Sequence, residues 1–124
     1  MTFLYDTINN ATLAKLLTQP DVILLDVRSV EEYEQLGHVP NAVLFPMDQI
    51  PTRLVELPKD RPLVIMCQHG VRSAMVCEYL VDQGFRRVFN HDAGMSVWDG
   101  DVAYDHDDAG TLPKTSAVKH VPLF

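Results

Sequence analysis

The architecture of this chain follows most directly from the stretch Pro62-Leu63-Val64-Ile65-Met66-Cys67-Gln68-His69-Gly70-Val71-Arg72-Ser73. It opens with a continuous apolar run, which is typical of a strand that is covered on both faces of a sheet. A short loop with a glycine follows, and the pattern from Ser73 onward predicts a helix that continues to about Gln83. The stretch therefore predicts a buried strand, a tight loop and a helix start, with a cysteine where the strand ends.

The position of Cys67 favours an ionised thiol. The backbone N–H groups of such a loop point inward, and the N-terminus of the helix adds partial positive charge. Arg72 adds a full positive charge. Surroundings of this kind lower a cysteine pKa from about 8.5 to roughly 3.5–7.5. We therefore expect Cys67 to act as a nucleophile at neutral pH, whereas a cysteine in a core is usually a small inert hydrophobe.

The length and charge of the chain narrow the class of protein. Its 124 residues fit one domain, and a domain of this size can bury a core without disulfides or metals. The formal net charge of -7 argues against nucleic acid or an anionic membrane surface as a partner. The N-terminus has no basic segment followed by a long apolar one, so we expect no signal peptide. No run is long enough to span a bilayer.

The two cysteines, Cys67 and Cys77, are too few for a disulfide scaffold. A free and activated thiol fits a reducing compartment, so we expect a cytoplasmic protein. Cys77 falls on the apolar face of the predicted helix and is expected in the core, with a resolving thiol as the alternative. No set of four ligands has a recognised spacing, so we expect no metal at His91-Asp92 or His106-Asp107-Asp108.

Short apolar runs alternate with helical patterns along the chain, which predicts an α/β domain with a mainly parallel sheet. The expected strands are 22–25, 42–45, 63–66 and 87–90. The expected helices are 11–18 with Asn10 as the N-cap, a short one through Gln35 that starts with the capping box Ser29 and Glu32, 52–57, and the one to Gln83 that ends at Gly84. Reactive groups lie at the carboxyl ends of strands in such folds, and Asp26 and Cys67 both occupy that position.

The composition changes after Gly100. Residues 101–110 are acidic and without periodicity, and residues 111–124 carry two prolines and scattered apolar side chains. We therefore expect a domain over residues 1–100 and a C-terminal tail over residues 101–124. The tail is either extended or packed on the domain or a neighbouring subunit through Val118, Val121, Leu123 and Phe124.

Taken together, these segments resemble the single-domain form of the rhodanese-like sulfurtransferases, over roughly residues 4–100. The marks are Leu24-Leu25-Asp26-Val27-Arg28, Glu31-Glu32-Tyr33, Gly37-His38-Val39-Pro40-Asn41-Ala42, Cys67 to Ser73 and Val88 to Trp98. The resemblance implies a central five-stranded sheet flanked by helices. Two features depart from the family pattern. Ala93-Gly94 stands where two glycines are usual, a change that we expect to lie outside the chemistry, and the last 24 residues have no counterpart.

The resemblance also implies a reaction in which Cys67 carries sulfur as a persulfide. The Cys67 thiolate attacks the sulfane sulfur of a small anionic donor such as thiosulfate, and sulfite leaves. A thiol, cyanide or a sulfur-accepting protein then removes the sulfur. The loop amides stabilise the developing negative charge, and neither a metal nor an organic cofactor is required.

Each residue of the loop has an expected role. Gln68, His69, Gly70, Val71 and Arg72 form the predicted substrate-binding loop. Arg72 either orients the donor or braces the loop through an ion pair, or does both. His69 is a candidate general base, although a thiolate that is already formed needs none. Gly70 is expected to meet a backbone requirement.

A second set of residues, Asp26, Arg28 and Ser73, is predicted to support the structure of the site. We expect Arg28 to pair with a carboxylate such as Glu32. These residues therefore hold the loop in place in this interpretation and do not take part in the chemistry.

Three other functions compete with sulfur transfer. Protein phosphatases and arsenate reductases place five residues between cysteine and arginine, whereas four separate Cys67 from Arg72, which predicts a cradle too tight for phosphate and no phosphatase activity. A sulfur carrier or regulatory interaction module would pass persulfide sulfur to a partner protein. A redox sensor would join Cys67 and Cys77, although the helix between them should hold them apart.

Overall fold

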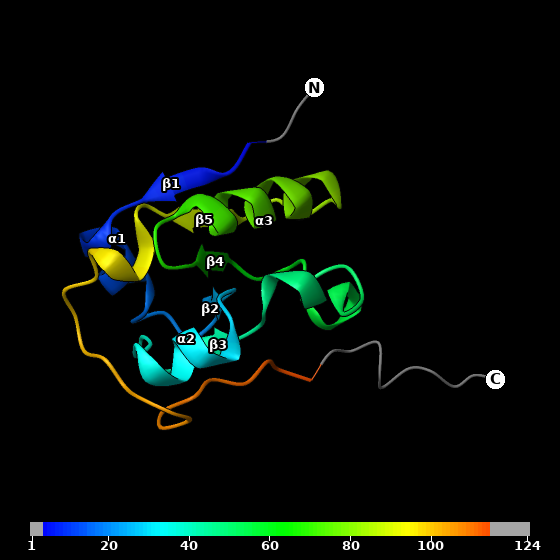
Figure 1. Cartoon of the computed structure of the whole chain (residues 1–124). Coiled ribbons are helices and arrows are strands. Elements are labelled where there is room, and N and C mark those ends of the chain that lie inside the picture. The colour runs from blue at the N-terminus through cyan, green and yellow to red at the C-terminus, as the bar shows by residue number, and fades with distance from the viewer. Residues whose placement is uncertain (1–3, 115–124) are drawn as a thin grey trace.

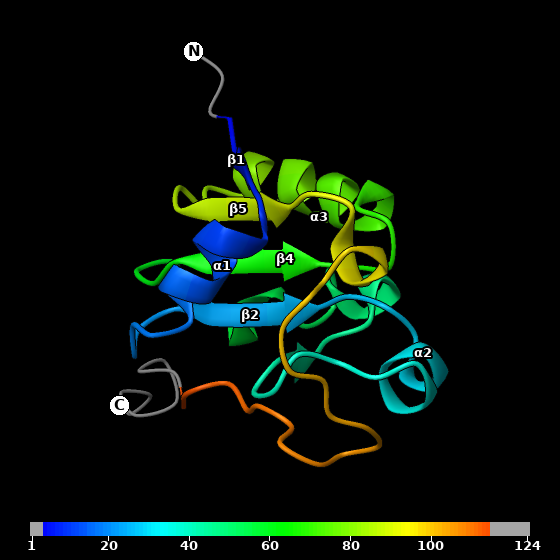
Figure 2. The same ribbon diagram turned by 90° about the vertical axis from the view of Figure 1, so that its left-hand side faces the viewer.

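The computed structural model describes residues 4–114, which form a sheet between two layers of helices (Figures 1 and 2). The sheet has five strands in the order β1-β5-β4-β2-β3, and every pairing is parallel. The strands are β1 (Asp6–Ile8), β2 (Ile23–Asp26), β3 (Val43–Leu44), β4 (Leu63–Met66) and β5 (Val88–His91). The predicted α/β fold with a five-stranded, mainly parallel sheet is confirmed.

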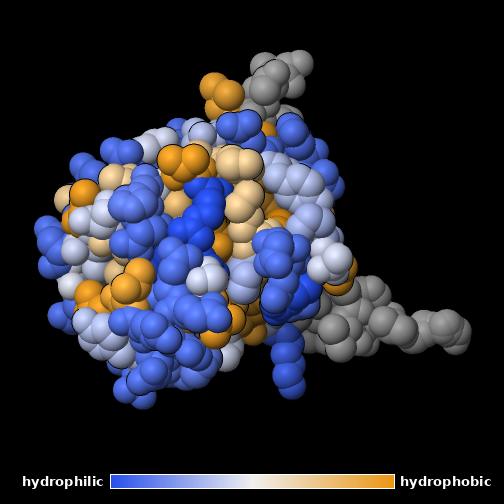
Figure 3. All heavy atoms as spheres, in the orientation of Figure 1, coloured by the Kyte–Doolittle hydropathy of each residue, from blue (hydrophilic) through white to orange (hydrophobic). Residues whose placement is uncertain are grey.

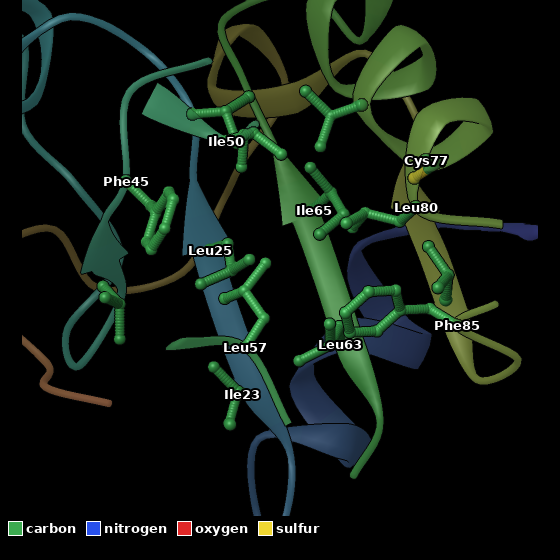
Figure 4. Close-up of a cluster of buried hydrophobic side chains, with 14 of the residues drawn as sticks. Ile23, Leu25, Phe45, Ile50, Leu57, Leu63, Ile65, Cys77, Leu80 and Phe85 are labelled. Atoms are coloured by element: carbon green, nitrogen blue, oxygen red, sulfur yellow. The ribbon is translucent and has the colours of Figure 1, made fainter. Parts of the chain in front are cut away.

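The central strands β2 and β4 are buried on both faces, as their unbroken apolar sequences predict. Their side chains alternate between two cores. Ile23, Leu25, Leu63 and Ile65 face the core under the long helix, shown in Figure 4. Leu24, Val64 and Met66 face the second core on the opposite side of the sheet. The sheet is therefore a fixed platform whose carboxyl edge is held from both sides.

Helices cover both faces of the sheet. The long helix α3 (Val71–Asp82) packs over the first core together with the 3-10 turns η1 (Met47–Gln49) and η2 (Leu54–Glu56). The helices α1 (Asn10–Leu16) and α2 (Val30–Gln35) contribute Leu13 and Tyr33 to the second core. A final turn, η3 (Gly94–Ser96), follows β5. None of the helices within residues 4–114 has the length and apolar character needed to cross a bilayer.

Local signals in the sequence placed both ends of α2 and the end of α3 correctly, but α3 begins at Val71, two residues before the predicted start at Ser73, and α1 ends at Leu16 and not at Thr18. The capping box of Ser29 and Glu32 is present, and Gly84 follows α3 with a φ of 95°, which a glycine adopts without strain. The N-cap of α1 is Asn9, however, and not Asn10. The side-chain oxygen of Asn9 accepts the Thr12 amide, whereas the side chain of Asn10 donates to the Val97 carbonyl. The predicted cap was wrong because two adjacent asparagines carry the same signal.

Two other elements differ from the prediction. The segment 52–57 forms only the short turn η2, because Pro58 follows it directly and disfavours the helical conformation at Leu57, which is extended. Strand β1 was not predicted at all. It has three residues, of which only Ile8 is buried, and it pairs with β5 alone at the edge of the sheet. A strand of this kind leaves no periodic pattern in the sequence.

Residues 101–114, which we call the strap, lie against the segment that leads into β3 (Figure 2). His38 and Ala103 exchange two backbone hydrogen bonds of 2.8 Å each. Further along, the amide of Asn41 donates to the Asp108 carbonyl, and the amide of Gly110 donates to the Ala42 carbonyl. The first part of the predicted tail is therefore paired with the domain. The expected packing of Val118, Val121, Leu123 and Phe124 lies outside the described residues.

The strap offers a direct test of its contribution to stability. A Cβ atom at Gly110 would collide with the backbone carbonyl of Asn41, so Gly110→Ala must push the strap away. We expect the variant to lose about 1–3 kcal/mol of unfolding free energy in urea denaturation, the usual cost of overpacking. Ala109→Ser, at the exposed neighbouring position, is the control and should change the value by less than about 0.5 kcal/mol. Equal stability of the two variants would show that the strap contributes nothing.

Candidate active site

The candidate nucleophile, Cys67, lies at the carboxyl edge of the sheet. Cys67 directly follows β4, whose last residue, Met66, stands beside Asp26 at the end of β2. The chain then turns at Gly70, which has a φ of 91° and precedes the first residue of α3. A Cβ atom there would lie 2.8 Å from the backbone nitrogen of Ala93. Gly70 therefore meets both a conformational and a steric requirement of the backbone, as its role in the predicted loop anticipated.

The loop surrounds the sulfur atom of Cys67 with hydrogen-bond donors. The amide nitrogen of Gly70 lies 3.1 Å from Sγ and that of Ser73 lies 3.3 Å from it. The thiol of Cys67 donates to the hydroxyl oxygen of Ser73 at 3.2 Å, and the same hydroxyl can donate to the sulfur once it is a thiolate. We call this arrangement the thiolate cradle. Cys67 is only 1% exposed, so these donors stand in for the water that would otherwise solvate a thiolate.

The cradle sets the ionisation of Cys67. Burial is the largest single influence on its pKa and favours the neutral thiol. Hydrogen bonds together outweigh burial and hold the pKa of Cys67 below its ordinary value. They come from the hydroxyl and amide of Ser73 and from the amides of Gly70 and His69. Burial without such donors raises the pKa of Cys77, and both cysteines are free. The pKa values of Cys67 and Cys77 are therefore shifted in opposite directions, and Cys77 lies in the core as predicted.

Arg72 braces the loop from the outside. Its two terminal nitrogens each donate to one carboxylate oxygen of Glu32, both at 2.8 Å. These hydrogen bonds are the main reason why the pKa of Glu32 falls to about 2. They also raise the pKa of Arg72, with a smaller contribution from the negative charge of Cys67. Of the two roles considered for Arg72, the ion pair is present in the structure.

The predicted partner of Arg28 was wrong. Arg28 is fully buried and pairs with Asp26, through Nε to both carboxylate oxygens and through Nη2 at 2.8 Å. Glu32 is taken by Arg72. The physical reason is local, because the backbone amide of Arg28 also donates to Asp26 and the turn between them brings the two side chains together.

The remaining donors of Arg28 extend its contacts to other loops. Nη2 donates to the carbonyl of Gly37, and Nη1 donates to the side-chain oxygen of Gln68 at 2.9 Å. Asp26 and Arg28 thus tie the second residue of the active-site loop to the end of β2. Their position beneath the loop agrees with a supporting role.

The turn after β5 also holds the loop, which the sequence did not predict. The amide of Met95 donates to the Cys67 carbonyl and that of Ser96 donates to the Gln68 carbonyl, both at 2.9 Å. A Cβ atom at Gly94 would collide with the carbonyl of Cys67. The Ala93-Gly94 turn, expected to lie outside the chemistry, is therefore a clamp on the reactive loop. The family glycine pattern was the only signal in the sequence that pointed to it.

Two predicted loop residues remain at the surface. His69 is exposed and no hydrogen bond of its ring is present within residues 4–114, whereas Val71 is 68% exposed at the start of α3. The hydrogen bonds that the structure shows for Sγ involve Gly70 and Ser73, and a contact of His69 or Val71 with substrate stays a prediction. Within the same range, no three His, Cys, Asp or Glu side chains gather as metal ligands. His91 instead bonds Asn10, and His106 pairs with Glu34.

The hydroxyl of Ser73 should control the ionisation of Cys67. In Ser73→Ala the amides of Ser73, Gly70 and His69 remain, but the hydroxyl that stabilises the thiolate is lost, so the pKa of Cys67 should rise. The rate of iodoacetamide alkylation, followed from pH 5 to 10 by mass spectrometry, should show its midpoint at higher pH. Ser96→Ala, which removes a hydroxyl that bonds the Ala93 carbonyl, is the matched control. An unchanged midpoint in Ser73→Ala would contradict the cradle.

The ion pair of Glu32 predicts a pH dependence of stability. The folded pKa of about 2 lies below the ordinary value of 4.5, so the unfolded chain binds more protons between these values. The contribution of Glu32 is complete above about pH 5 and is lost as the pH falls towards 2. In urea denaturation, Glu32→Gln should flatten this acid decline, and Glu31→Gln, at the exposed neighbouring position, should not. Parallel acid declines in both variants would exclude the pair as the cause.

Comparisons with known proteins agree with this geometry. The model of the rhodanese-like domain matches residues 9–101. A sulfurtransferase of Allochromatium vinosum is 44% identical over 84 residues, which are 68% of this chain and 78% of that protein. The thiosulfate sulfurtransferase GlpE of Pseudoalteromonas translucida is 35% identical over 92 residues, 74% of this chain and 87% of that protein.

Solved structures lead to the same family. A rhodanese-like domain protein from Staphylococcus aureus superposes with a TM-score of 0.72 and 40% sequence identity, and the match covers 80% of this chain and 97% of that one. The family model and the solved structure cover most of the chain. The chain is thus a member of the rhodanese-like sulfurtransferase family.

Proposed function

We propose that this protein transfers sulfane sulfur through a persulfide on Cys67. The observation that carries the proposal is the thiolate cradle, in which Gly70 and Ser73 direct three donors at one sulfur atom. Such donors stabilise a thiolate before the reaction and the negative charge of a persulfide after it. A single activated sulfur suits chemistry in which sulfur itself is the group transferred.

The reaction has two steps. In the first, the Cys67 thiolate attacks the outer sulfur of a donor such as thiosulfate, a bond forms between the two sulfurs, and sulfite leaves with the electron pair of the broken S–S bond. In the second, a thiolate or cyanide attacks the outer sulfur of the persulfide and Cys67 leaves as the thiolate. No proton or external electron is required, so His69 need not act as a base.

The size of the loop supports sulfur over phosphate as the group that is handled. Four residues separate Cys67 from Arg72, and the donors of Gly70 and Ser73 already converge on Sγ at 3.1–3.3 Å. Arg72 is turned to Glu32, where it braces the loop. We therefore expect no release of phosphate from aryl phosphates. The free thiols fit a reducing compartment, and we propose the cytoplasm.

Loading of Cys67 with sulfur tests the proposal. Intact-protein mass spectrometry after incubation with thiosulfate should show the addition of one sulfur atom to the wild type, and cyanide should remove it. Cys67→Ser should gain nothing. Cys77→Ser is the matched control and should load as the wild type does, because burial keeps Cys77 a neutral thiol. Failure of the wild type to gain sulfur from any sulfane donor would refute the proposal.

A sulfur carrier that serves a partner protein would use the same persulfide. Turnover separates the two roles: a carrier loads Cys67 but returns sulfur slowly to cyanide and small thiols. Catalytic turnover with small acceptors, abolished by Cys67→Ser, would favour the enzyme.

A further inference from the structure

The clamp on the active-site loop needs a fixed position of its own. It is the turn η3 after β5, where the amides of Met95 and Ser96 hold the carbonyls of Cys67 and Gln68. The turn lies beside the start of α1 (Figure 1). The surface seen from the same side is mainly hydrophilic, with small hydrophobic areas between (Figure 3). Met95 is only partly buried against the second core, so hydrogen bonds supply much of the order of the turn.

The side chain of Asn10 ties the far end of this turn to β5. Its nitrogen donates to the carbonyl of Val97, which directly follows η3, at 2.6 Å. Its oxygen lies 2.7 Å from Nε2 of His91, the last residue of β5. The backbone of His91 thus leads into the turn, and its ring holds the side chain that secures the end of the turn. The two ends of the clamp are therefore linked through one contact between α1 and β5.

The groups at each end of Asn10 decide the direction of these hydrogen bonds. The carbonyl of Val97 can only accept, so Asn10 presents its NH₂ group to it. The side-chain oxygen of Asn10 then faces His91, and Nε2 of the ring carries the proton that this oxygen accepts. The other ring nitrogen, Nδ1, is buried and has no partner within residues 4–114. His91 is 0% exposed, so the bond to Asn10 replaces the water that its N–H group would otherwise bind.

The clamp reaches the sulfur of Cys67 through a single peptide group. The carbonyl of Gln68 and the amide of His69 are the two ends of one planar, trans peptide. Ser96 holds the carbonyl end at 2.9 Å, and the amide end is one of the groups that lower the pKa of Cys67. A trans peptide directs its carbonyl and its amide in opposite directions. The clamp therefore aims a further amide at the sulfur.

We propose that Asn10 and His91 are positioning residues for Cys67, and that they act through the turn η3. Together they hold the end of the turn, the turn holds the peptide after Gln68, and this peptide directs its amide at the sulfur. A small rotation of the peptide weakens that interaction, because hydrogen bonds weaken steeply as their angle closes. This role deepens the function proposed above, and its effect on sulfur loading rests on that function. Its effect on the ionisation of Cys67 does not.

Substitution of Asn10 tests the link. Asn10→Ala removes the tie to Val97, so the amide of His69 should lose its alignment and Cys67 should ionise at higher pH. The rate of iodoacetamide alkylation of Cys67, followed from pH 5 to 10 by mass spectrometry of its peptide, should show its midpoint at higher pH. The ratio of the rate at pH 7 to that at pH 10 should fall severalfold.

The adjacent asparagine provides the matched control. Asn9→Ala removes the N-cap of α1, which accepts the Thr12 amide, but leaves the bonds of Asn10 in place. This variant should unfold at a lower urea concentration than the wild type, with the alkylation midpoint of the wild type. Loading of Cys67 from thiosulfate at pH 7 should likewise slow severalfold in Asn10→Ala and stay unchanged in Asn9→Ala. The pair separates lost stability of α1 from lost alignment at Cys67.

Two substitutions at His91 test the other half of the contact. His91→Gln presents an amide N–H near the position of Nε2 and can keep the bond to Asn10, so its midpoint should stay close to that of the wild type. His91→Leu fills a similar space without a donor, and its midpoint should rise as that of Asn10→Ala does. In the double variant of Asn10→Ala and His91→Leu the two shifts should not add, because both changes break the same link.

An unchanged midpoint in Asn10→Ala would overturn the inference, and so would equal shifts in Asn9→Ala and Asn10→Ala, because Asn10 would then serve stability alone. If His91→Leu does not fold, Asn10→Ala and His91→Gln still decide, and a shift in His91→Gln as large as that in Asn10→Ala would also overturn it. Failure of the wild type to gain sulfur from any sulfane donor would refute the proposed function alone, since alkylation reports on Cys67 without it.

Discussion

The geometry of the site depends on one buried ion pair, that of Asp26 and Arg28. An ion removed from water costs several kcal/mol unless hydrogen bonds replace its hydration, and Arg28 finds them on three separate segments. The guanidinium of Arg28 therefore joins three segments: the end of β2, the loop at Gly37 and the side chain of Gln68. Because removal of one partner of such a pair leaves an unpaired buried charge, the three segments are fixed as a unit. This unit holds the active-site loop in place.

The negative charge of the Cys67 thiolate is stabilised in a different way from the positive charges of Arg28 and Arg72. The arginines are each matched by a carboxylate, whereas the thiolate is matched by amides and a hydroxyl. Dipoles can stabilise a negative charge on either of two adjacent sulfurs without holding a counterion in the way. The clamp formed by the turn at Gly94 keeps these dipoles aligned through the carbonyls of Cys67 and Gln68. The hydrogen bonds that hold the loop in place thus also align the amides that favour ionisation of Cys67.

The sequence predicted those features that depend on local pattern. The buried strands, the capping box at Ser29 and the cysteine at a strand end all follow from neighbours in the chain. The sequence could not predict the ion pairs and contacts that depend on tertiary structure. Asp26 and Glu32 were both within reach of Arg28, and only the fold assigns the second of them to Arg72. The contact of Gly94 with Cys67 likewise requires the β4–β5 register. The strap has an irregular sequence and no periodicity from which its course could be read.

The position of the strap bears on how the molecule behaves among its own copies. Strand β3 has only two residues and pairs with β2 alone, so one side of it is an open border of the sheet. Unpaired backbone groups at such a border are a template on which a strand of another molecule can grow. The backbone of the strap occupies the donors and acceptors next to this border, at His38, Asn41 and Ala42. An acidic, irregular segment in that place discourages fibrillar self-association at high concentration. This role of the strap is separate from the chemistry of Cys67.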